Sequence, residues 1–108
     1  SKFLDCQMYQ RSGDMFLGVP FNIASTSLLT YILSKMVCIN PGKIRITIGD
    51  AHIYENHKDQ VTEQLKRNPY QFPKLQIEPF KNLEDLTYEH FILQDYKSHP
   101  TIKAVMIP

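Results

Sequence analysis

The chain has 108 residues, the usual size of one domain, so we expect residues 1–108 to share a single core. A hydrophobic fraction of 43% and a charged fraction of 21% exclude a disordered or collagen-like chain. The formal net charge is +1, with basic residues scattered among acidic ones, so nucleic acid is not expected as the main partner.

No apolar run reaches the length of a membrane span, and the first residues lack a secretory signal. We therefore expect a cytoplasmic protein with no membrane partner. Cys6 and Cys38 lack the C-x-x-C spacing and are expected to be reduced and buried. No two of the four histidines lie four residues apart, as an H-E-x-x-H zinc site requires, and we expect no metal.

The first half of the chain predicts a strand followed by a long helix. Residues 3–12 alternate with period two, which places Cys6, Met8 and Gln10 on one face and Arg11 on the other. Residues 21–39 have apolar side chains on several faces, which predicts a buried central helix. Pro20 fits the first turn of that helix, and residues 40–42 (Asn-Pro-Gly) are expected to end it.

A second strand is predicted over residues 43–54, because isoleucines at 44, 46 and 48 alternate with polar residues. In that phase Asp50, His52 and Tyr54 would share the inward face and would need polar partners. Asn56 and Asp59 resemble a capping box that opens an amphipathic helix. Beyond Pro69 the patterns predict a short strand over 74–78, a helical turn over 85–90, and a strand and tail from Ile92. The fold class predicted is α/β (α+β).

Several segments together resemble the thymidylate synthase family. They are residues 6–14 with 17–25, then 49–57, then Pro69 with 72–75, and finally 99–103, all in the order and spacing of that family. The resemblance covers essentially the whole chain and implies the thymidylate synthase fold, a mixed or antiparallel sheet packed on a long buried helix. It also implies that the chain is the C-terminal portion of a single thymidylate synthase domain, truncated only at its start. The activity implied is the reductive methylation of dUMP to dTMP with methylenetetrahydrofolate as co-substrate.

The resemblance assigns dUMP contacts to five residues. Arg11 and Ser12 match the pair that binds the phosphate, and a guanidinium fork suits phosphate oxygens. Asn22 matches the asparagine that reads the pyrimidine, where one amide both donates and accepts. His52 and Tyr54 match the pair that hydrogen-bonds the deoxyribose hydroxyl. Without the resemblance, Arg11 would be interpreted as a solvated arginine and Asn22 as a helix cap. His52 and Tyr54 would be interpreted as core residues whose polar groups bond the neighbouring backbone.

The folate contacts implied by the resemblance lie in the loop that precedes the helix. Asp14 matches the aspartate that holds the pterin ring, and Gly18 and Phe21 would flank the cofactor. The alternative for Asp14 is a turn aspartate that hydrogen-bonds its own backbone. Asn56 is a weaker candidate for the polar network that assists proton transfer, and with Asn22 it completes the catalytic residues expected in this chain. Asp50 has no role that can be separated from its neighbours.

The mechanism implied by the resemblance is covalent, with a cysteine thiolate adding to the pyrimidine ring. In the family that cysteine lies in a Pro-Cys-His motif upstream of the arginine strand, and this sequence contains no such motif. Alternation places Cys6 opposite Arg11, so Cys6 is not expected to be the nucleophile. The chain alone is therefore expected to be inactive. The resemblance also implies a homodimer, with the strand at 3–12 in the interface sheet.

In the family the C-terminal tail folds over the site and usually finishes in a small or aliphatic residue. Pro108, with its fixed φ and no amide proton, is a departure from that pattern that would hinder the closure. Two other functions remain open from the sequence. A dCMP hydroxymethylase of the same fold is disfavoured because that enzyme has aspartate at the position of Asn22. A non-catalytic nucleotide-binding fragment is the alternative from another class.

Overall fold

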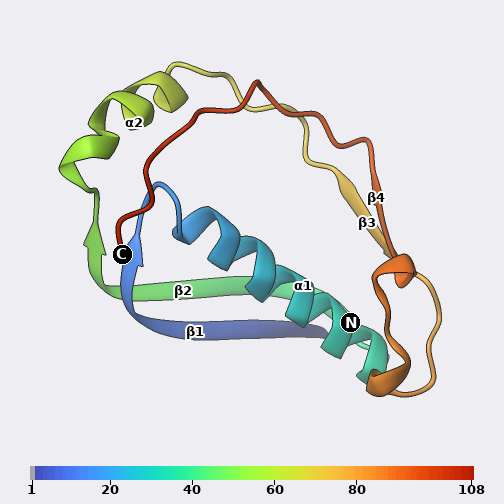
Figure 1. The fold of residues 1–108 in the computed structure, drawn as a ribbon. Helices are drawn as coiled ribbons and strands as arrows, with labels where there is room; N and C mark the ends of the chain where they lie inside the picture. The colour runs from blue at the N-terminus through green and yellow to red at the C-terminus, as the bar shows by residue number, and fades with distance from the viewer. Residues whose placement is uncertain (1) are drawn as a thin grey trace. The chain divides into compact units, whose positions relative to one another are not determined.

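The computed structural model describes residues 2–108, which combine helices and strands and divide into two compact units (Figure 1). Of the described residues, the first unit contains 2–64 and 102–108, and the second contains 65–101. The α/β fold class predicted from the sequence is confirmed. Within residues 2–108, no helix combines the length and apolar character needed to cross a membrane.

The first unit is built on two parallel strands joined by a helix. Strand β1 (Phe3–Asp14) pairs with β2 (Asn40–His52), and helix α1 (Val19–Val37) makes the connection between them, as Figure 1 shows. Parallel strands require such a crossover, since a tight turn cannot bring the chain back to the start of the next strand. The ladder pairs Cys6 with Ile44 and Asp14 with His52, with an irregularity between Leu4 and Cys6.

The predicted faces of both strands are confirmed. Residues 4, 6, 8 and 10 of β1 and residues 44, 46 and 48 of β2 are half-buried, while the intervening residues from Asp5 to Arg11 and from Arg45 to Gly49 are exposed. Tyr9 is 71% exposed on the outer face. On β1 the half-buried face meets α1, because Met8 accepts a bond from Thr26 and Gln10 donates to Asn22. Period-two alternation therefore correctly identified the side of β1 that meets the helix.

Helix α1 begins at Val19 with Pro20 in its first turn, as expected, but its end differs from the prediction. Cys38 adopts a left-handed conformation with φ of 56°, and its N–H donates to the Ser34 carbonyl. The helix therefore ends before residues 40–42, which already belong to β2. There the Lys43 N–H donates to Asp5 Oδ1 at 2.7 Å. The expected burial of Cys38 is also wrong, because this residue is exposed.

The prediction that α1 is buried on all sides is corrected by the structure. Its buried side chains are Val19 in the first turn and three small polar residues that recur every fourth position and form one stripe: Thr26, Thr30 and Ser34. Leu29, Leu33 and Met36 are between 41% and 52% exposed. A sheet of two strands covers one side of a helix, so the apolar residues on the other sides of α1 have no cover within the described residues.

After β2 the chain forms a 3-10 turn η1 (Glu55–His57) that leads directly into helix α2 (Lys58–Leu65). The predicted capping box at Asn56 and Asp59 is wrong. Tyr54 is the residue that precedes the turn, no side chain caps it, and Asn56 lies inside the turn. Since the 3-10 turn starts one residue before Asn56, the amide has no free helix end to cap.

The second unit is a small antiparallel hairpin with two 3-10 turns in its connection. Strand β3 (Lys74–Ile77) pairs with β4 (Phe91–Gln94), which confirms both predicted strands. The helical turn expected over 85–90 is two separate turns, η2 (Leu83–Asp85) and η3 (Tyr88–His90), each closed by a capping box. Ile77 is buried at 5% exposure, and the Tyr70 and His99 rings stack at 4.4 Å.

Candidate functional site

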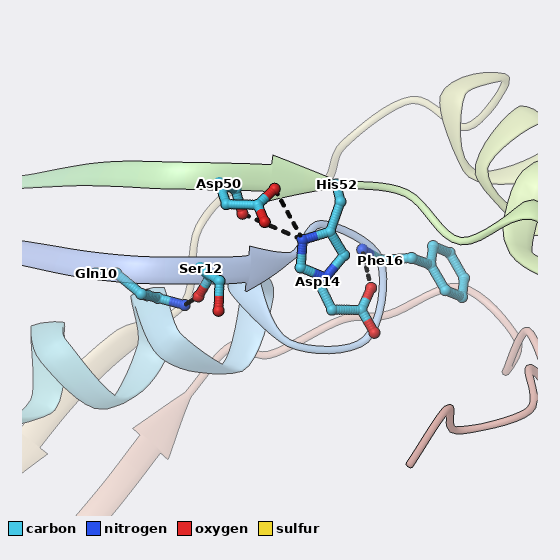
Figure 2. Close-up of polar contacts among 6 residues, drawn as sticks. All are labelled: Gln10, Ser12, Asp14, Phe16, Asp50 and His52. Carbon is cyan, nitrogen blue, oxygen red and sulfur yellow. Dashed lines mark hydrogen bonds and ion pairs between the residues drawn. The ribbon is translucent and has the colours of Figure 1, made fainter.

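Every residue assigned a role from the sequence lies in the first unit, and several meet where β1 and β2 end. The register pairs Ser12 with Asp50 and Asp14 with His52, so the polar ends of both strands lie next to each other (Figure 2). In open sheets, ligands bind beyond the carboxyl ends of parallel strands. The sequence predicted the polar residues of each strand, but their proximity follows from the parallel pairing.

The Asp14 carboxylate is partly committed to its own loop. Its Oδ1 accepts the N–H groups of Phe16 at 3.1 Å and Leu17 at 3.3 Å, as Figure 2 illustrates for Phe16. The turn aspartate considered as an alternative is therefore present. Yet Oδ2 accepts no hydrogen bond within the described residues, and the side chain is 21% exposed. One carboxylate oxygen organises the loop while the other remains available to a ligand donor.

Gly18 stands at the start of α1, where the chain comes close to the Asp14 loop. Its N–H donates to the Asp14 carbonyl at 3.0 Å, and a Cβ on Gly18 would lie 3.1 Å from that oxygen. This close approach between Gly18 and the Asp14 loop explains why a glycine is needed here, and the explanation requires no ligand. Phe21, in the first turn of α1, is 72% exposed, so its ring is available for contact.

Arg11 and Ser12 are neighbours in sequence but lie on opposite faces of β1. Arg11 is exposed and Ser12 is half-buried. The Ser12 carbonyl accepts the Gln10 side-chain amide at 2.8 Å (Figure 2). A ligand group that contacts both side chains must therefore reach the end of the strand, where the two faces meet.

Gln10 is a residue that sequence reasoning left without a role. Its Nε2 donates to the Ser12 carbonyl and, at 3.0 Å, to Asn22 Oδ1. A backbone carbonyl only accepts, so the amide of Gln10 must present its nitrogen there, and the atom of Asn22 that faces it must be oxygen. Gln10 thereby sets the orientation of the Asn22 amide. The sequence feature that could have indicated this role is the position of Gln10 on the helix-facing side of β1, one residue before Arg11.

Asn22 and Gln10 both line a hollow of about 280 Å³ between β1 and α1, together with Met8, Tyr9, Ser25 and Thr26. Gln10 Oε1 is buried and has no hydrogen-bond partner among the described residues. Asn22 keeps its Nδ2 donors and one Oδ1 lone pair for another partner. The hollow thus offers adjacent donor and acceptor groups of defined orientation.

His52 and Tyr54 form an aromatic pair at the exit of β2, with ring centroids 5.1 Å apart and nearly perpendicular planes. His52 Nδ1 lies 3.1 Å from the Asp50 carbonyl, and 3.6 Å from Asp50 Oδ1 (Figure 2). Because the carbonyl only accepts, Nδ1 carries the proton in the neutral ring and Nε2 is left as an acceptor. Such a nitrogen suits a hydroxyl donor. Asp50 itself is exposed, which corrects its expected inward placement.

Asn56 is exposed in η1, whereas the neighbouring His57 has no exposed surface. Cys6 is half-buried and free, on the face of β1 that meets α1. In the part of the chain that the structure describes, no three histidine, cysteine or acidic side chains gather as a metal site.

Comparison with known proteins gives concordant results. The sequence model of the family described as thymidylate synthase matches residues 1–108. The thymidylate synthase of Mycoplasma pneumoniae (strain ATCC 29342 / M129 / Subtype 1) is 53% identical over 101 residues, which is 94% of this chain and 35% of that protein. The chain thus spans about a third of the length of this relative.

Proposed function

Because this chain belongs to the thymidylate synthase family, we propose that it supplies the nucleotide-binding and folate-contacting part of an enzyme that methylates dUMP to dTMP. The observation that carries this proposal is the Asn22 amide, oriented by Gln10 at the side of a hollow near the ends of two parallel strands. That amide donates from Nδ2 and accepts at Oδ1. Uracil presents a carbonyl next to a ring N–H, which is the complementary arrangement.

The remaining dUMP contacts follow from the chemistry of the strand ends. Arg11 binds the phosphate through its exposed guanidinium, and Ser12 adds a hydroxyl donor. His52 Nε2 accepts from the deoxyribose hydroxyl, since its Nδ1 proton is engaged by Asp50. Tyr54 lies beside that imidazole and adds its phenol group. These roles are consistent with the free donors and acceptors described above.

The folate co-substrate fits the loop that joins β1 to α1. Asp14 Oδ2 is free to accept an N–H of the pterin ring, while Oδ1 keeps the loop in place. Phe21 offers an exposed aromatic surface next to Gly18. Methylenetetrahydrofolate supplies the one-carbon unit and the hydride, and the chain's own residues bind and orient it. Asn22 and Asn56 are the polar groups proposed to assist proton movement.

We propose that the nucleophilic cysteine lies outside these 108 residues, and that the chain alone is inactive. Cys6 faces α1 from the half-buried side of β1, away from exposed Arg11. The outer face of β1 carries Phe3 and Tyr9 at 60% and 71% exposure, which supports a homodimer that covers this face. We expect the enzyme to be soluble and cytoplasmic and to use no metal.

The test uses isothermal titration of dUMP, dCMP and dTMP against this chain and against the full gene product that contains it. We expect dUMP-selective binding. Covalent trapping by fluoro-dUMP with the folate is expected in the full gene product alone. Equal affinity for dUMP and dCMP in both proteins would refute the assignment. Preference for dCMP would identify the hydroxymethylase alternative, which the amide at position 22 disfavours. Binding without trapping in the full gene product would leave the non-catalytic alternative.

A further inference from the structure

His57 is the largest side chain in the described residues that is fully buried, and the proposed function gives it no role. It closes the η1 turn, where its backbone N–H donates to the Tyr54 carbonyl at 3.0 Å. The Phe16 ring lies 5.6 Å from the imidazole and the Tyr54 ring lies 5.7 Å from it, centroid to centroid. The imidazole thus lies between the loop after β1, which carries Phe16, and Tyr54, which is two residues beyond the end of β2.

The imidazole also contacts the C-terminal segment, defined here as residues 102–108. His57 Nε2 lies 2.6 Å from the Val105 carbonyl oxygen. Since a carbonyl only accepts, Nε2 carries the proton. In the neutral ring, Nδ1 is then an acceptor. It has no partner within residues 2–108 and stands 3.9 Å from Asp14 Oδ1, beyond hydrogen-bond distance.

The C-terminal segment has few other attachments. It forms no helix or strand, so no ladder of backbone hydrogen bonds holds it. A second side-chain bond to the segment runs from Gln60 to the Lys103 carbonyl at 3.3 Å and is exposed. The bond from His57 is shorter and is part-buried, whereas the bond from Gln60 is exposed, so the His57 bond is the stronger of these two attachments.

We propose that His57 is a positioning residue for the folate step, which fastens the C-terminal segment through Val105 and holds it beside the Asp14 loop. This rests on the proposed function, in which Asp14 is the pterin contact. One ring touches both the segment and the loop. Removing its Nε2 donor therefore releases the segment while leaving the dUMP contacts at Arg11, Asn22 and His52 in place.

The test uses the full gene product with three substitutions. His57→Phe keeps an aromatic ring for Phe16 and Tyr54 but removes the donor to Val105. His57→Gln keeps an N–H near the position of Nε2. Thr62→Ala is the matched control, since Thr62 lies in α2 and its hydroxyl donates to the Lys58 carbonyl rather than to the segment. Two measurements are made: the KM for each substrate, and the rate at which trypsin cleaves after Lys103.

We expect His57→Phe to raise the KM for methylenetetrahydrofolate about tenfold and the cleavage rate by a similar factor, with the KM for dUMP unchanged. His57→Gln should restore most of both, and Thr62→Ala should match the wild type. In a protein shortened after Ala104, His57→Phe should add no further change in the folate KM.

Three results would overturn the proposal. The first is a folate KM and a rate of trypsin cleavage in His57→Phe that equal those of the wild type. The second is an equal loss of dUMP and folate binding that His57→Gln does not restore, which is the signature of a general structural role. The third is a full effect of His57→Phe in the shortened protein. If the wild type fails to turn over dUMP, the proposed function fails, yet the cleavage rates still decide whether His57 fastens the segment.

Discussion

Replacing Gln10 tests the orientation of the Asn22 amide most directly. Gln10→Leu retains much of the side-chain volume but removes the two bonds from Nε2, at 3.0 Å to Asn22 Oδ1 and at 2.8 Å to the Ser12 carbonyl. The amide of Asn22 would then be free to rotate by half a turn. In the rotated form it presents a donor where uracil has its ring N–H, and it matches cytosine instead.

The magnitude follows from the bond that is lost. A neutral hydrogen bond contributes about 0.5–1.5 kcal/mol, which corresponds to roughly two- to twelvefold in an equilibrium constant. We therefore expect the ratio of dCMP to dUMP dissociation constants to fall by roughly tenfold in Gln10→Leu. The loss of a partner for the Ser12 carbonyl costs about 1–3 kcal/mol, offset in part because the orphaned Gln10 Oε1 disappears as well. The net decrease in stability should be about 1 kcal/mol.

The assay is isothermal titration of both nucleotides against the full gene product, with thermal unfolding as the check on folding. Gln7→Leu is the matched control, because Gln7 has the same side chain on the exposed face of the same strand and donates to Thr47 at 3.1 Å. It should leave the selectivity unchanged. An unaltered ratio in a well-folded Gln10→Leu protein would show that Gln10 does not orient Asn22.

Three further predictions concern other parts of the site. Asp14→Asn should keep the loop conformation, because the amide oxygen still accepts from Phe16 and Leu17. It should weaken folate binding by roughly 10- to 100-fold through loss of a charge-assisted bond, measured by titration with folate in the presence and absence of dUMP. A loss of dUMP affinity with unchanged folate affinity would contradict the assignment. Gly13→Ala should destabilise the protein by about 1–3 kcal/mol in urea unfolding, because its Cβ would lie 2.9 Å from Val19 Cγ2, and wild-type stability would refute that packing. Cys6→Ser should retain covalent trapping by fluoro-dUMP in the full gene product, whereas loss of the adduct in a folded protein would identify Cys6 as the nucleophile.

The sequence alone determined the order of strands and helices and the faces of both strands in the first unit. Alternation of the isoleucines in β2 with polar residues needs only the geometry of an extended chain, and Pro20 fits a helix start for a purely local reason. The family motifs likewise named Arg11, Asn22, Asp14 and His52 before any contact was known.

Only the tertiary structure decided how these residues meet. The parallel pairing of β1 with β2 brings Asp14 next to His52. The alternation of residues within each strand is the same for parallel and antiparallel pairing, so the sequence did not predict this direction. The helix stop at Cys38 depends on a left-handed residue that is not glycine, which composition does not reveal. The roles of Gln10 and His57 arise from hydrogen bonds to Asn22 and Val105, which lie 12 and 48 residues further along the chain. Contacts over such separations depend on how the chain packs, and local sequence patterns do not predict them.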